Sequence, residues 1–135
     1  MGGEFYDMGR GRLTRLWKAR VPVKDLSIAV EFYRDVLELE VLIDDTPHGW
    51  VEIGWGKDDG SIILYVPEKD DKRQPGGDTG IVFATDSLFE VHRRLVDEEV
   101  EFVVKPERRP WGLIAIFLDP YGNELTVLDA APEKK

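Results

Sequence analysis

Two segments of this chain repeat one pattern of residues, and this duplication restricts the possible folds more than any other feature. Residues 38–43 read Glu-Leu-Glu-Val-Leu-Ile, and residues 99–104, which lie 61 positions further on, read Glu-Val-Glu-Phe-Val-Val. Asp25 and Asp86 are related by the same shift, and each precedes a helical pattern. Two copies of one supersecondary unit are the simplest explanation.

Each copy has strand-like alternation on both sides of one helical stretch. The strand patterns cover residues 16–23, 39–44, 50–55 and 61–66 in the first copy, and residues 79–85, 100–104, 112–118 and 124–128 in the second. The order is strand, helix and three strands, twice over. We therefore predict an α+β fold of two βαβββ modules that form a half-barrel-like mixed sheet with a cleft, with the helices on the outer face.

The domain boundaries follow from composition along the chain. Residues 1–13 are rich in glycine and show no apolar period, which predicts a flexible tail. The charged stretch 68–78 lacks apolar anchors and is predicted to be an exposed linker. The prediction is one domain, residues 14–135, with module 1 at about 14–67 and module 2 at about 79–129. A stiff loop is expected at residues 106–111.

Capping and apolar residues mark the two helices. Asp25 is the expected N-cap of the first helix, and Ser87 with Glu90 is spaced as a capping box for the second. Glu38 and Glu99 fall where a left-handed residue would end each helix. The predicted buried stripes are Leu26, Ala29, Val30, Phe32, Tyr33, Val36 and Leu37 in the first helix and Leu88, Val91, Leu95 and Val96 in the second.

Residues 119–123, Asp-Pro-Tyr-Gly-Asn, predict a hairpin turn between the last two strands. The Asp119 carboxylate can accept local backbone hydrogen bonds, Pro120 fixes its own φ, and Gly122 tolerates a positive φ.

Composition excludes several classes of protein. The 135 residues include no cysteine, so disulfides and thiolate metal sites are excluded. The net charge of −9 opposes binding to nucleic acid or to an anionic membrane. No apolar run approaches the roughly 18 residues of a membrane-spanning helix, and the first residues lack the apolar core of a signal peptide. We expect a cytoplasmic protein.

Three motifs together resemble the vicinal oxygen chelate superfamily, which includes glyoxalase I, bleomycin-resistance proteins and extradiol dioxygenases. They are residues 21–26, Val-Pro-Val-Lys-Asp-Leu; residues 32–37, Phe-Tyr-Arg-Asp-Val-Leu; and residues 119–125, Asp-Pro-Tyr-Gly-Asn-Glu-Leu. The resemblance covers residues 16–129. In the metal-dependent members, four cleft-facing positions supply His, Gln or Glu ligands.

The resemblance places Lys18, Ile63, Gly80 and Thr126 at these four positions. None of them is a usual ligand of a divalent metal, because an ammonium repels the ion and an alkyl group offers no donor. We therefore expect no metal and no cofactor. The two histidines agree with this expectation, since His48 is predicted to be a solvated turn residue and His92 to face the packing side of the second helix.

Strand alternation, counted by twos from the four positions, predicts the residues that face the cleft. The predicted ligand-binding residues are Lys18, Arg20, Trp50, Glu52, Ile63, Tyr65, Val82, Trp111, Ile114, Ile116, Glu124 and Thr126. The charged members would anchor a ligand or pair with one another at the rim, where a lysine could be lost with its partner still solvated. The two tryptophans would stack on a planar ligand, or fill the core or a subunit interface.

Three functions remain open from the sequence. The leading hypothesis is a metal-free protein that binds and sequesters a partly apolar, planar small molecule, with a mild preference for cations because the surface is acidic. The alternative is a glyoxalase-like lyase or isomerase with a non-standard metal site or with Glu52, Glu124, Lys18 or Tyr65 as acid–base residues. The third is a non-catalytic interaction domain. A homodimer is expected, because the open sheet faces need covering.

Overall fold

The computed structural model describes residues 11–56 and 59–129, which form two modules of the same architecture. The first module contains β1 (Lys18–Pro22), α2 (Leu26–Val30), the π-helical η1 (Glu31–Val36), β2 (Glu40–Asp45), the 3₁₀-helical η2 (Thr46–His48), β3 (Trp50–Gly54) and β4 (Ser61–Tyr65). The second contains β5 (Gly77–Thr85), α3 (Leu88–Asp97), β6 (Phe102–Arg109), β7 (Gly112–Leu118) and β8 (Asn123–Asp129).

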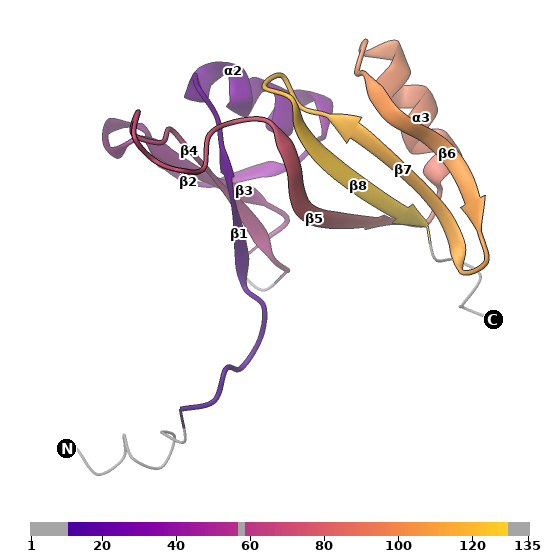
Figure 1. The fold of residues 1–135 in the computed structure, drawn as a ribbon, viewed down its shortest axis with the longest axis horizontal. Coiled ribbons are helices and arrows are strands. Elements are labelled where there is room, and N and C mark those ends of the chain that lie inside the picture. Colours follow the sequence, from indigo (N-terminus) through magenta and orange to yellow (C-terminus); the bar gives the residue numbers. More distant parts are fainter. Residues whose placement is uncertain (1–10, 57–58, 130–135) are drawn as a thin grey trace.

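Each module builds one four-stranded mixed sheet. The strand orders are β1-β4-β3-β2 and β5-β8-β7-β6. The first strand of each module pairs in parallel with the last, and the other pairings are antiparallel. The two sheets lie side by side, and their edge strands β1 and β5 face each other (Figure 1). Residues 11–17 extend away from the body of the molecule. This arrangement confirms the α+β fold of two βαβββ modules. None of the helices in the described residues is long and apolar enough to cross a membrane.

Two strands of the second module extend into segments that the sequence predicts as a loop or a linker. β6 continues through Pro106 to Arg109, so the predicted loop at residues 106–111 is wrong for residues 106–109 and is reduced to a turn at Pro110 and Trp111. Proline is tolerated there because β6 is an edge strand and its register shifts between Val104 and Glu107. β5 begins at Gly77, inside the predicted linker.

The first helix begins as predicted and then widens. The Asp25 carboxylate accepts hydrogen bonds from the backbone N–H groups of Ser27, at 2.9 Å, and Ile28, at 3.2 Å. Further along, the N–H of Leu37 donates to the carbonyl of Phe32, five residues earlier, at 3.0 Å. Phe32 and its neighbour Tyr33 are both buried in this wider segment.

The second helix is capped from another element. Ser87 occupies the N-cap position but makes no side-chain cap bond, so the predicted capping box with Glu90 is wrong. The carboxylate of Asp129, at the end of β8, instead accepts from the N–H of Leu88 at 3.0 Å. Leu88 and Leu95 are buried as predicted, whereas Val96 is 48% exposed and does not belong to the stripe.

Both helices are followed by a residue in the left-handed region. Glu38 and Glu99 each have a φ of 64°, which confirms the prediction for these two positions. A side chain with a Cβ is strained in this conformation.

The turn at residues 119–123 joins the two modules as well as two strands. Asp119 accepts backbone bonds from Tyr121 and Asn123 through one carboxylate oxygen, which confirms the predicted hairpin. Its other oxygen accepts from the Tyr33 hydroxyl on the first module's helix and from the Asn123 amide, both at 2.8 Å. Asn123 also donates to the carbonyl of Pro22 at the end of β1, at 2.9 Å. A buried polar network therefore holds β1, the first helix and the β7–β8 hairpin together.

Candidate functional site

Half of the predicted ligand-binding residues gather on one face of the first sheet. Arg20 lies beside Ile63 in the parallel β1–β4 pair, and Ile63 lies beside Glu52 in the antiparallel β3–β4 pair. Trp50 lies beside Tyr65 two positions further along. Residues paired across strands share a face, so these five side chains and that of Lys18 belong to the same surface.

A partly buried ion pair occupies the end of this surface. The Lys18 ammonium lies 2.7 Å from the Glu52 carboxylate, and the Ser61 hydroxyl donates to the same carboxylate oxygen at 2.6 Å. Burial alone would raise the pKa of Glu52, but the hydrogen bonds from Lys18 and Ser61 and the charge of Lys18 outweigh it and lower that pKa. Glu52 is 6% exposed, so the expectation that the partner of Lys18 stays solvated is wrong.

A second group of predicted residues lies on the second sheet. Thr126 pairs with Val82 on one side and with Ile116 on the other, and Ile114 lies two residues before Ile116 on β7. Glu124 occupies the next equivalent position on β8. Trp111 stands apart in the turn between β6 and β7 and is 47% exposed. The predicted set thus divides into a charged group on the first sheet and a mostly apolar group on the second.

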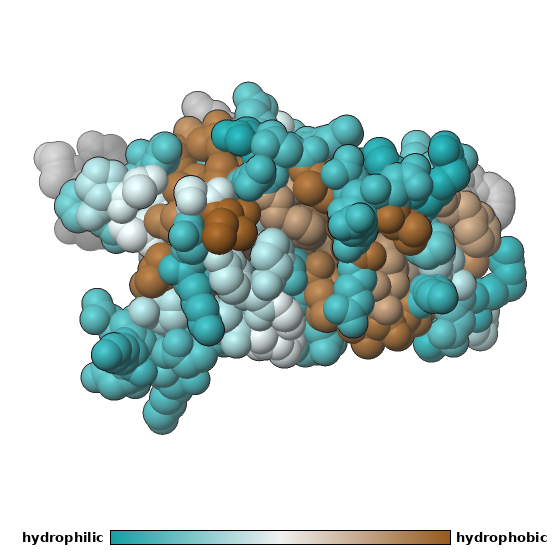
Figure 2. Space-filling view, turned by 90° about the horizontal axis from the view of Figure 1, so that it is seen from above, coloured by the Kyte–Doolittle hydropathy of each residue, from teal (hydrophilic) through white to brown (hydrophobic). Residues whose placement is uncertain are grey.

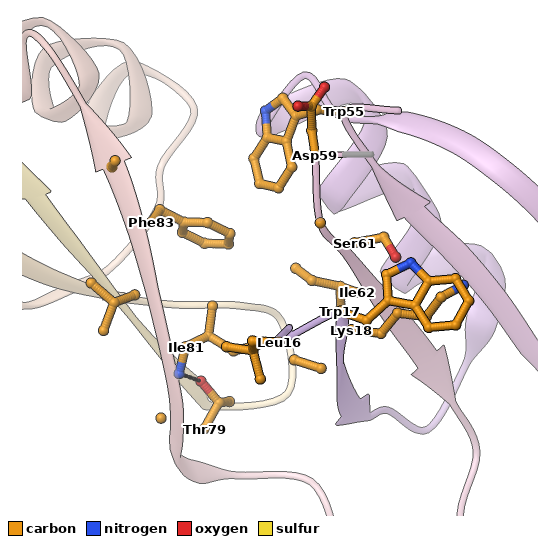
Figure 3. A pocket seen from close by; sticks show the side chains of 15 residues that line it. Leu16, Trp17, Lys18, Trp55, Asp59, Ser61, Ile62, Thr79, Ile81 and Phe83 are labelled. Atoms are coloured by element: carbon orange, nitrogen blue, oxygen red, sulfur yellow. Dashed lines mark hydrogen bonds between the residues drawn. The ribbon is translucent and has the colours of Figure 1, made fainter. Parts of the chain in front are cut away.

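A hollow of about 720 Å³ lies where the two modules meet, and we call it the inter-module hollow (Figure 3). Its walls come from the segment before and within β1, from the β3–β4 region and from β5. Ile62 and Ala19 line it from the first sheet, and Ile81 and Phe83 line it from the second. The Trp55 ring meets the Phe83 ring edge to face, with centroids 5.8 Å apart. The hollow therefore has apolar and aromatic walls suited to a flat, apolar molecule.

A smaller hollow of about 330 Å³ lies against the face of the first sheet that carries Arg20 and Ile63, and we call it the Arg20 hollow. Ile63 lines this hollow, whereas its neighbour Ile62 lines the inter-module hollow, because successive side chains of a strand point to opposite faces. The residues that line the Arg20 hollow are Arg20, His48, Gly49, Trp50, Ile63, Tyr65 and Val66.

Each hollow is lined by some of the predicted ligand-binding residues and by some residues that were not predicted. Arg20, Trp50, Ile63 and Tyr65 from the predicted set line the Arg20 hollow. Lys18 and Val82 line the inter-module hollow, but the sequence analysis missed Trp55 and Phe83 there. The signal for Phe83 was present, because Ile81 and Phe83 alternate with Gly80 and Val82, and only the latter face was counted as functional. Trp55, which follows the last residue of β3, carried a similar signal, because it continues the alternation of Val51 and Ile53 on the face that was not counted as functional.

The four family metal positions do not fit a metal. Lys18 carries a positive charge and already pairs with Glu52, Ile63 has no donor atom, and Thr126 offers one hydroxyl. In residues 11–56 and 59–129 there is no group of three or more His, Asp and Glu residues that could hold a metal ion.

Neither histidine adds a donor to the metal positions. His48 lies in the turn before β3, and its Nδ1 is 2.8 Å from the Asp45 carboxylate. His92 packs edge to face on Phe102, with ring centroids 4.7 Å apart, so it serves the helix interface as predicted.

Comparison with known proteins identifies the family. Residues 15–127 match the family model of the Glyoxalase/Bleomycin resistance protein/Dioxygenase superfamily. An uncharacterized protein of Shewanella frigidimarina is 30% identical, with 75% of this chain and 82% of that protein covered. Among solved structures, a superfamily member from Sphaerobacter thermophilus is 29% identical, with a TM-score of 0.78 over 86% of this chain and 97% of that one. TnmS3, an antibiotic binding protein from Streptomyces sp. CB03234, is 27% identical, with a TM-score of 0.75 over 86% of this chain and 95% of that one. The chain belongs to the Glyoxalase/Bleomycin resistance protein/Dioxygenase superfamily.

Proposed function

We propose that this chain is a metal-free binding protein that sequesters a planar, partly apolar small molecule in the inter-module hollow. The observation that carries the proposal is the hollow itself, because about 720 Å³ suffices for a drug-sized molecule and its walls include the rings of Trp55 and Phe83. The likeness to TnmS3, which is described as an antibiotic binding protein, supports a binding role.

The geometry of Glu52 argues against its use as a general base. A general base must be free to accept a proton near the working pH. Glu52 is held by Lys18 and Ser61, which lower its pKa and occupy one of its oxygens. We therefore assign this carboxylate to the local structure and assign no chemical step to the site.

The experiment is a calorimetric titration of the purified chain with a panel of planar aromatic compounds, followed by mass spectrometry of the recovered compound. We expect saturable binding with one molecule per chain and recovery of the compound unchanged. Chemical conversion of the compound would replace the proposal with the enzyme hypothesis. The absence of saturable binding across the panel would replace it with the interaction-domain hypothesis.

Two variants test where the compound binds. Trp55 is 49% exposed, so Trp55→Ala should fold and should weaken binding about tenfold by removing one aromatic wall. Ile116→Glu places a charge on the other predicted surface, the apolar face of the second sheet, and should leave binding unchanged. If Ile116→Glu abolishes binding and Trp55→Ala does not, the ligand lies on the second sheet and the assignment to the inter-module hollow is wrong.

We also propose that the chain forms a homodimer. Leu13 is 100% exposed, Leu16 is 95% exposed and Trp17 is 54% exposed on the segment that extends from the body. The face seen in Figure 2 also carries hydrophobic patches between hydrophilic side chains. A second copy that covers such surfaces would bury apolar area, and closed two-fold assembly is the commonest way to do so. A monomer mass by light scattering at micromolar concentration would contradict the dimer.

A further inference from the structure

Positive charge is concentrated at the start of this acidic chain. Residues 8–24 hold six of the 18 Lys and Arg residues and no Asp or Glu, so the remainder carries all 27 acidic residues against 12 basic ones. β1 lies within this basic segment and contributes Lys18 and Arg20 to the first sheet. The local charge on β1 is therefore opposite in sign to the charge of the whole chain.

Arg20 lies over an aromatic ring in the Arg20 hollow. Its guanidinium carbon is 4.1 Å from the centroid of the Tyr65 ring. A guanidinium that lies over a ring keeps its N–H donors free, because these donors lie in the plane of the group and the ring contacts its face. Trp50 lies beside Tyr65 in the β3–β4 pair, and Ile63 lies beside Arg20 in the β1–β4 pair. The hollow thus combines one oriented cation with apolar and aromatic side chains.

Two other ionisable side chains of this region already have partners. Lys18 pairs with Glu52 at 2.7 Å, and the His48 ring lies 2.8 Å from the Asp45 carboxylate. For Arg20, by contrast, no carboxylate lies within 4.0 Å in the part of the chain that the structure describes. Its charge is therefore available to a ligand.

We propose that the Arg20 hollow is a second binding site, selective for planar aromatic carboxylates. The carboxylate pairs with the in-plane N–H groups of Arg20, which match its two oxygens in spacing. The aromatic ring lies against Trp50 and Ile63. The Arg20 hollow shares no lining residue with the inter-module hollow, so this second site goes beyond the proposed function.

The net charge of the chain does not decide the charge of this ligand. The acidic surface attracts cations over long distances, but solvent ions screen charges more than about 8 Å apart at physiological salt. A carboxylate in the hollow would be in contact with Arg20. The contact therefore determines affinity, and the acidic surface mainly slows the approach of an anion.

Three compounds with one ring system test the charge preference. The probes are 2-naphthoate, the neutral 2-naphthamide and the cationic 2-naphthylmethylammonium, each titrated at pH 7 and 0.15 M salt. Tryptophan fluorescence follows the binding, and Trp50→Phe assigns the signal to this hollow. We expect 2-naphthoate to bind about tenfold more tightly than either of the other two, which corresponds to one charge-assisted hydrogen-bonded pair.

Two arginine variants with the same change of charge complete the test. Arg20→Gln should weaken 2-naphthoate about tenfold and leave 2-naphthamide unchanged, whereas Arg12→Gln, on the extended segment, should change neither. Equal losses from both variants would show a general charge effect and overturn the proposal. Equal binding of the three probes, or no signal from Trp50 with any of them, would also overturn it. Trp55→Ala should not affect 2-naphthoate binding here, so the result is independent of the inter-module hollow.

Discussion

The buried amide of Asn123 should be one of the largest single contributors to the stability of this fold. Asn123 is 1% exposed, and its side chain makes three hydrogen bonds. The amide oxygen accepts from the N–H of Gly76 at 2.8 Å, and the amide nitrogen donates to the Pro22 carbonyl at 2.9 Å and to the Asp119 carboxylate at 2.8 Å. Asn123→Ala removes all three and leaves their partners without this side chain.

The expected cost is about 4–5 kcal/mol. Each lost bond is worth about 1 kcal/mol net, and a buried group left without a partner adds about 1–3 kcal/mol. The upper part of this penalty is excluded, because the Asp119 carboxylate keeps its hydrogen bond from Tyr33. A domain of this kind has a total stability of about 5–15 kcal/mol, so the variant should fold but with a small margin.

Urea unfolding at pH 7 measures this cost. With a slope of about 2 kcal/mol per molar urea, the midpoint of Asn123→Ala should fall by about 2 M while the slope stays the same. Tyr121→Phe is the control, because the Tyr121 hydroxyl contacts only the exposed region around Asp25, and its loss should cost less than about 0.5 kcal/mol. Tyr33→Phe combined with Asn123→Ala should be non-additive, since both side chains donate to one oxygen of Asp119. A loss below about 1 kcal/mol for Asn123→Ala, or strict additivity, would refute the idea that this network holds the modules together.

Three further predictions follow from individual groups. Burial, with the charge of Asp119 and the hydrogen bond to it, raises the pKa of Tyr33 well above its ordinary value of 10.0. The stability that the protonated Tyr33 hydroxyl contributes is therefore complete below pH 10 and falls as the pH rises further. Tyr33→Phe should flatten the alkaline limb of a plot of stability against pH, and an unchanged limb would contradict the assignment. Glu99→Gly relieves the backbone strain at a φ of 64° and should raise the free energy of unfolding by up to about 1 kcal/mol. Glu99→Ala keeps the strain and should not raise the free energy of unfolding. Equal melting temperatures for the two variants would show that the strain does not affect stability. Glu52→Gln leaves the Lys18 ammonium without its partner and should lower the free energy of unfolding by about 1–3 kcal/mol. Adding Lys18→Met to the same chain should partly restore that stability. A double variant no more stable than Glu52→Gln alone would show that the two residues are not coupled.

Periodicity was sufficient to predict the fold, because it depends on many residues at once. The duplication and the alternation of apolar residues predicted both modules, and errors at single positions changed only element boundaries. Pro106 is such an error, since a proline usually marks a loop but is compatible with a bulged edge strand. Ser87 is another, because the sequence offers a local cap but cannot show that Asp129, 42 residues away, reaches the same helix end.

The candidate site was less predictable, because it depends on which faces of two sheets are left open. Alternation separates the two faces of a strand but does not say which of them a second module covers. Counting by twos from the four family metal positions predicted Arg20, Trp50, Ile63 and Tyr65, which line the Arg20 hollow. The same count did not include Phe83, which lies on the other face of β5 and lines the inter-module hollow. The pairing of Lys18 with Glu52 was among the alternatives, whereas the burial of Glu52 depends on packing that the sequence does not show.

The comparison of the two modules explains why duplication predicts the fold and not the site. Glu38 and Glu99, which the repeat relates, have the same φ, so the backbone path after each helix is common to both modules. The helix caps differ. Asp25 lies directly before the first helix and caps it, whereas the second helix is capped by Asp129, which lies at the end of β8. The strand pairings relate Thr126 to Ile63, so Asp129 corresponds to Val66, which has no carboxylate and cannot play the same part.

The same divergence appears on the open faces of the sheets. The first sheet carries an ion pair and an arginine over a tyrosine ring, while the second carries a mostly apolar set around Ile116 and Thr126. The backbone path after each helix is common to the modules, whereas the side chains on the open faces differ, and it is these side chains that we propose to contact a ligand. Substitutions that exchange side chains between related positions of the two modules should therefore alter binding more than they alter the fold, provided that the Tyr33–Asp119–Asn123 network is left intact.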